Sequence, residues 1–121
     1  MNTLRIGSGA GYSGDRIEPA VELAEHGDLD YLVFECLAER TIALAQQARI
    51  SDPQGGYDPL LAERMRRVLP FVGQGTGRRR LRVITNMGAA NPLAVASEVR
   101  RIAGELGLGL GELLLVLRPL P

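Results

Sequence analysis

Four short, nearly continuous apolar runs have the pattern of buried β-strands. They lie at residues 4–6, 30–35, 81–85 and 113–117. Between them, apolar residues recur every three or four positions, which predicts helices at residues 15–25, 38–49, 60–72 and 93–106. The predicted elements therefore follow the order β-α-β-α-α-β-α-β.

Strands that alternate with helices predict a parallel sheet joined by right-handed crossovers. We therefore expect an α/β fold, specifically a three-layer α/β/α Rossmann-like domain with a mainly parallel sheet and helices on both faces. The 121 residues are enough for one core, and we expect a single α/β domain over residues 1–121.

Capping and turn residues mark the ends of several predicted elements. Asp15 and Glu18 have the spacing of a capping box at the start of the first helix. Asp58 and Asn91 each precede a proline, the order typical of an N-cap and the first helical residue. A glycine-rich turn is predicted at residues 73–77.

A glycine-rich segment, residues 7–14, separates the first predicted strand from the first helix. Backbone N–H groups that lack side-chain cover at such a junction suit a phosphate, a carboxylate or another anion. We therefore predict ligand-binding roles for residues of this segment and its mouth, namely Gly9, Gly11, Gly14, Asp15 and Arg16.

The same segment contains G-x-G-x-x-G, the dinucleotide-binding fingerprint, over residues 9–14. Glu35 follows Gly14 by 21 residues, where a dinucleotide fold holds its ribose carboxylate. However, the segment is longer than the tight turn of that fingerprint, and its third glycine precedes the helix. Three interpretations stay open: a dinucleotide site, another small-molecule or anion site, and a purely structural turn.

Polar residues follow the second and third predicted strands at the same edge of the sheet. Glu35 is a candidate general base, because partial burial raises a carboxyl pKa; alternatively it bonds to loop N–H groups or to Arg16. Asn86, Gly88 and Asn91 are predicted to bind ligand, although capping alone explains Asn91. We expect these residues and the glycine segment to line one pocket.

Composition narrows the range of functions. The formal net charge is zero, so neither nucleic acid nor a membrane surface is an expected partner. The run at residues 78–80 is interpreted as a solvated strand entry. The single histidine, His26, and single cysteine, Cys36, do not suggest a metal site. No leader or long apolar run is present, which favours the cytoplasm.

Three ordered motifs, at residues 9–16, 29–39 and 85–92, resemble the N-terminal part of the acyclic terpene utilisation protein AtuA family. The resemblance covers about residues 4–108. It implies a role in bacterial breakdown of acyclic terpenes such as citronellol and geraniol, whose intermediates are coenzyme A thioesters. The implied ligand is a terpenoid or an acyl-CoA, whereas neither a cofactor nor a reaction is implied.

The chain departs from the family pattern at residues 109–121, and family members continue into a further α/β portion. We therefore expect a chain that lacks the C-terminal portion, or one that self-associates through exposed apolar surface. The competing hypotheses are a dinucleotide-dependent oxidoreductase domain and a non-catalytic, truncated interaction domain. Whether the protein is an enzyme stays open.

Overall fold

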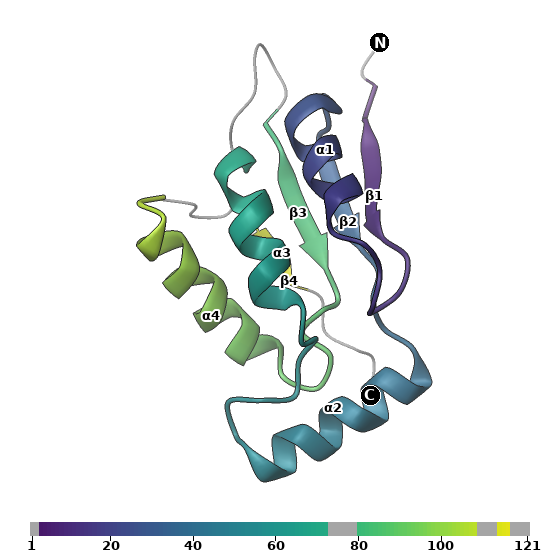
Figure 1. The fold of residues 1–121 in the computed structure, drawn as a ribbon, viewed down its shortest axis with the longest axis vertical. Helices are drawn as coiled ribbons and strands as arrows, with labels where there is room; N and C mark the ends of the chain where they lie inside the picture. The colour runs from purple at the N-terminus through teal and green to yellow at the C-terminus, as the bar shows by residue number, and fades with distance from the viewer. Residues whose placement is uncertain (1–2, 73–79, 109–113, 117–121) are drawn as a thin grey trace.

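The computed structural model describes residues 3–72, 80–108 and 114–116. Its elements follow the predicted order. They are β1 (Ile6–Ala10), α1 (Glu18–His26), β2 (Tyr31–Phe34), α2 (Glu39–Ser51), α3 (Leu61–Val68), the short 3₁₀ helix η1 (Leu69–Phe71), β3 (Arg82–Thr85), α4 (Pro92–Glu105) and β4 (Leu114–Val116). Figure 1 shows these elements in sequence colours. The predicted turn at 73–77, most of the arginine run and most of the tail lie outside the described residues.

The four strands form one parallel sheet in the order β1-β2-β3-β4. The register pairs Leu32 with Val83, and Phe34 with Thr85. Because the carboxyl ends of parallel strands share one edge, the segments that follow β1, β2 and β3 meet there. The α/β class and the parallel sheet are thus confirmed.

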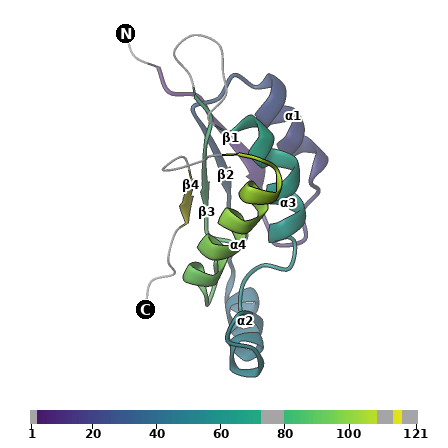
Figure 2. The same cartoon turned by 90° about the vertical axis from the view of Figure 1, so that its left-hand side faces the viewer.

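The helices that pack on the sheet lie on one face. Figures 1 and 2 show α1, α3 and α4 side by side in a single layer, whereas α2 lies beyond the carboxyl edge of the strands. The strand order explains this arrangement, because right-handed crossovers that always step in one direction place their helices on the same face. In the part of the chain that the structure describes, we therefore find two layers where helices on both faces were expected.

The core lies between this helical layer and the sheet. Leu32, Phe34 and Val83 are almost fully buried in it. Their strand neighbours Val33 and Ile84 are half-buried, as the alternation of side chains across a sheet requires. One face of the sheet is thus covered by the helices, and the other face is less buried.

Two boundaries near the glycine segment differ from the predicted ones. β1 runs through Gly9 to Ala10, with an irregular register between Ser8 and Ala10. A Cβ at Gly9 would lie 2.7 Å from the ring of Phe34, so close packing in the sheet, and not a loop, requires this glycine. In addition, α1 begins at Glu18, and Asp15 is not its cap. The capping box predicted there is wrong.

Candidate functional site

A cavity of about 180 Å³ lies between the carboxyl edge of the sheet and α2. Its walls come from the segments after β1, β2 and β3, from one face of α2 and from the segment before α3. The lining residues are Ser13, Cys36, Leu37, Thr41, Leu44, Ala45, Ala48, Tyr57, Asp58, Pro59, Asn86, Met87 and Ala89. Most of these side chains are apolar. The cavity therefore has the character of a small-molecule pocket with a few polar groups.

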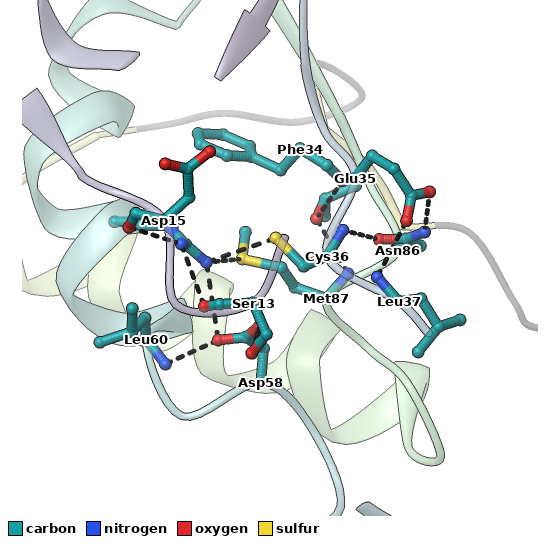
Figure 3. Close-up of polar contacts among 12 residues, drawn as sticks. Ser13, Asp15, Phe34, Glu35, Cys36, Leu37, Asp58, Leu60, Asn86 and Met87 are labelled. Carbon is teal, nitrogen blue, oxygen red and sulfur yellow. Dashed lines mark hydrogen bonds and ion pairs between the residues drawn. The ribbon is translucent and has the colours of Figure 1, made fainter. Parts of the chain in front are cut away.

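A hydroxyl–carboxylate pair stands in the cavity wall. Ser13 Oγ donates a hydrogen bond to Asp58 Oδ2 at 2.8 Å. Asp58 is 6% exposed, and its other oxygen accepts the N–H of Leu60 at 2.8 Å. Figure 3 shows Ser13 and Asp58 next to each other. Asp58 therefore orders the turn before α3 and also holds a side chain from the glycine segment. The N-cap of α3 is Leu60, so the prediction of Asp58 as cap, with Pro59 as the first helical residue, is wrong.

Arg64 of α3 is fully buried and forms an ion pair with Asp58, but it does not itself line the cavity. Its guanidinium lies 3.6 Å from Asp58 Oδ1 and donates to the backbone carbonyls of Ser13 and Asp15. It also contacts the sulfur atoms of Cys36 and Met87, at 3.4 Å each. Arg64 thus ties together the segments that follow β1, β2 and β3. Its Nε has no hydrogen-bond partner among the described residues.

The carboxylate of Asp15, which follows the glycine segment, binds backbone N–H groups of that segment and its mouth. Asp15 accepts the backbone N–H groups of Gly11 and Arg16, at 2.9 and 2.8 Å. These two hydrogen bonds lower the pKa of Asp15 below its ordinary value. Two N–H groups that could bind an external anion therefore already have an anionic partner. A Cβ at Gly11 or Gly14 would meet no atom closer than 3.8 Å, so packing does not require these glycines.

Glu35 and Asn86 lie together at the ends of β2 and β3. Asn86 Nδ2 donates to Glu35 Oε2 at 2.6 Å, and Asn86 Oδ1 accepts the N–H of Cys36 at 2.8 Å. Glu35 also accepts the N–H of Leu37 at 2.9 Å. The exposed Glu35 therefore bonds to a neighbouring loop N–H, which is the alternative interpretation of this residue.

Asn91 and Gly88, in the segment between β3 and α4, form hydrogen bonds with other parts of the protein. Asn91 caps α4 by accepting the N–H of Ala94, and its Nδ2 donates to the carbonyls of Pro53 and Gly55. Gly88 is buried, and its carbonyl accepts the N–H of Asn91 at 2.7 Å. The predicted cap at Asn91 is confirmed.

Of the residues predicted to bind ligand, Asn86 lines the cavity. Those that do not line it are Gly9, Gly11, Gly14, Asp15, Arg16, Glu35, Gly88 and Asn91. Sequence reasoning did not assign Ser13, Tyr57, Asp58 or Arg64 to the site. One signal for Arg64 exists, because it falls on the apolar stripe of α3, between Leu61 and Val68.

Burial raises the pKa of the Cys36 thiol from 9.0 to about 11. The thiol is therefore neutral at physiological pH and a poor nucleophile. We expect native protein at pH 7.5 to react with iodoacetamide at least about 100-fold more slowly than urea-unfolded protein. The unfolded thiol ionises above about pH 9 and the folded one only near pH 11, so the contribution of Cys36 to stability falls across this window. Rapid alkylation of native protein, followed by mass spectrometry, would contradict this assignment.

Two further types of site were sought in the described ranges. No group of three or more His, Cys, Asp or Glu side chains there is arranged to hold a metal ion. Nor does any described helix have the length and apolar character needed to cross a membrane.

A comparison with models of protein families gives a match over most of the chain. The family model described as "Acyclic terpene utilisation family protein AtuA" matches residues 4–116. No curated protein and no solved structure matches the chain significantly. Because the family model covers most of the 121 residues, the chain belongs to the acyclic terpene utilisation family AtuA.

Proposed function

We propose that the cavity at the carboxyl edge binds a terpenoid, or the acyl part of its coenzyme A thioester, during the use of acyclic terpenes. The family supports the pathway. The observation that carries the binding site is an apolar cavity with the Ser13–Asp58 pair in its wall. An apolar lining with few polar groups suits a hydrocarbon chain with one oxygenated end.

The size of the cavity limits how much of the ligand it encloses. A buried cavity of about 150 Å³ accommodates benzene, whereas pockets for drug-sized ligands span about 300–1,000 Å³. The 180 Å³ observed here therefore suit one end of an acyclic terpenoid. The rest of the ligand's hydrocarbon chain would lie against Leu44, which lines the cavity and is 54% exposed. The nucleotide part of coenzyme A would stay outside.

The dinucleotide alternative has less support. Gly14 precedes the start of α1 at Glu18, so the third glycine cannot pack that helix against a strand as the fingerprint needs. The carboxylate of Glu35 is held by Asn86 and by the Leu37 N–H. Both geometries favour a small-molecule site at the cavity over a ribose site at Glu35.

Thermal unfolding with added ligands tests the proposal. Citronellol, geraniol, the corresponding acids, acyl-CoA esters and NAD should be compared with the full chain. A ligand at 100 times its Kd adds about 2.7 kcal/mol to the free energy of unfolding. Stabilisation by terpenoids and not by NAD is expected. If no compound stabilises the protein, the non-catalytic interaction domain becomes the better explanation.

Filling the cavity should remove this stabilisation. Ala48 lines the cavity, whereas Ala43 is exposed on the opposite face of α2. We expect Ala48→Leu to weaken terpenoid binding at least about tenfold, because added methylene groups occupy the ligand's space. Ala43→Leu is the matched control and should bind as the unmodified protein does. Equal affinities for the two variants, measured by calorimetry, would place the ligand elsewhere.

A further inference from the structure

The polar groups in the cavity wall carry information about the polar end of the ligand. The Ser13 hydroxyl uses its hydrogen in the bond to Asp58 Oδ2, so its oxygen is left as an acceptor. The Thr41 hydroxyl donates to the carbonyl of Ala38 at 2.8 Å and accepts the Ala38 N–H at 2.7 Å. Asn86 donates one amide hydrogen to Glu35 and accepts the Cys36 N–H, so its second amide hydrogen is the donor that it has left. The Ser13–Asp58 pair, by contrast, offers only acceptors to a ligand.

The Asp58 carboxylate has spare capacity to accept. An ionised carboxylate offers about four acceptor positions. Asp58 uses them for Ser13, for the Leu60 N–H and for the Arg64 guanidinium. One position is thus left over in a residue that lines the cavity.

Of the two charges in the buried Asp58–Arg64 ion pair, only the negative one lies in the cavity wall. Asp58 lines the cavity, but its partner Arg64 does not. A second anion placed against the Ser13–Asp58 pair would contact the carboxylate directly, whereas the side chains of Cys36 and Met87 lie between the cavity and Arg64. Like charges at close range in a partly buried site repel strongly. This arrangement disfavours a free acid.

We propose that the cavity selects the alcohol form of its ligand: a neutral hydroxyl that donates a hydrogen bond to the Ser13–Asp58 pair. This inference rests on the proposed function, and it names the oxidation level that the site prefers. The oxygen of an aldehyde is only a hydrogen-bond acceptor, so an aldehyde cannot donate a hydrogen bond to the Ser13–Asp58 pair. An acid adds a negative charge beside Asp58.

The test compares three ligands with one carbon skeleton. Citronellol, citronellal and citronellic acid should be titrated into the 121-residue protein at pH 8, with calorimetry as the readout. We expect the alcohol to bind at least about tenfold more tightly than the acid, and also more tightly than the aldehyde. An acid or aldehyde that binds as well as the alcohol would overturn the inference.

Two single-hydroxyl deletions make the test specific. Ser13→Ala removes an acceptor and is expected to lower alcohol affinity about five- to tenfold, with little change for the acid. Ser97→Ala removes an exposed hydroxyl on α4, away from the cavity, and should leave alcohol affinity unchanged. If Ser13→Ala has no larger effect than Ser97→Ala, the pair does not recognise the ligand.

The outcomes separate the two proposals. Preference for the acid, together with loss of binding in Ala48→Leu, would retain the cavity as the ligand site and overturn the preference for an alcohol. Absence of binding by all three ligands would overturn both.

Discussion

Replacement of Arg64 by methionine is expected to lower the free energy of unfolding by about 3–5 kcal/mol. Arg64 is fully buried and is the cationic partner of Asp58, at 3.6 Å. Its loss leaves a buried carboxylate without a counter-charge, and the Ser13 and Asp15 carbonyls lose a donor. Methionine fills a similar volume beside Met87, and removal of the unpartnered Nε–H offsets part of the cost. Urea unfolding followed by circular dichroism measures the change.

Arg66 provides the matched control on the same helix. It pairs with Glu105 at 2.8 Å at the surface, and Arg66→Met should change stability only slightly, because exposed ion pairs are screened by water. Asp58→Asn introduced into Arg64→Met should recover part of the lost stability, since the uncompensated charge disappears. If Arg64→Met is no more destabilising than Arg66→Met, the buried pair does not support the site.

Gly56→Ala is expected to destabilise the protein by about 2–4 kcal/mol. Gly56 has φ +93°, which side chains of L-residues rarely adopt, and an added Cβ would lie 2.8 Å from Cβ of Arg49. The Gly56 carbonyl accepts the N–H of Ala90 at 2.9 Å, which joins the segment before α3 to the segment after β3. Strain at Gly56 would therefore disturb two walls of the cavity. Thermal and urea unfolding measure the loss.

Gly104→Ala is the matched control. Gly104 lies in α4, and a Cβ there meets no atom within 4 Å. Alanine favours the helix over glycine, so this variant should gain about 0.5–1 kcal/mol. Opposite signs for the two substitutions are expected. A Gly56→Ala protein as stable as the unmodified chain would show that the segment adjusts without cost.

The cavity itself had no counterpart in local sequence patterns. Its lining residues come from five segments along the chain, and of these residues only Asn86 was predicted to bind ligand. The site predicted from the glycine segment stays a prediction, although Ser13 of that segment and the predicted residue Asn86 line the cavity. Its chemistry was not predictable, because Asp15 meets the N–H groups that were expected to bind an anion.

The sequence by itself determined the order of strands and helices, the parallel sheet and the cap at Asn91. These features depend on apolar periodicity and on side chains that bond to nearby backbone, so they are local. Only the tertiary structure decided that Gly9 belongs to a strand, because the ring of Phe34 packs against it. It also decided that Arg64 is buried and that Asp58 faces a cavity. Burial and charge pairing depend on residues brought together by folding, and a local pattern does not contain them.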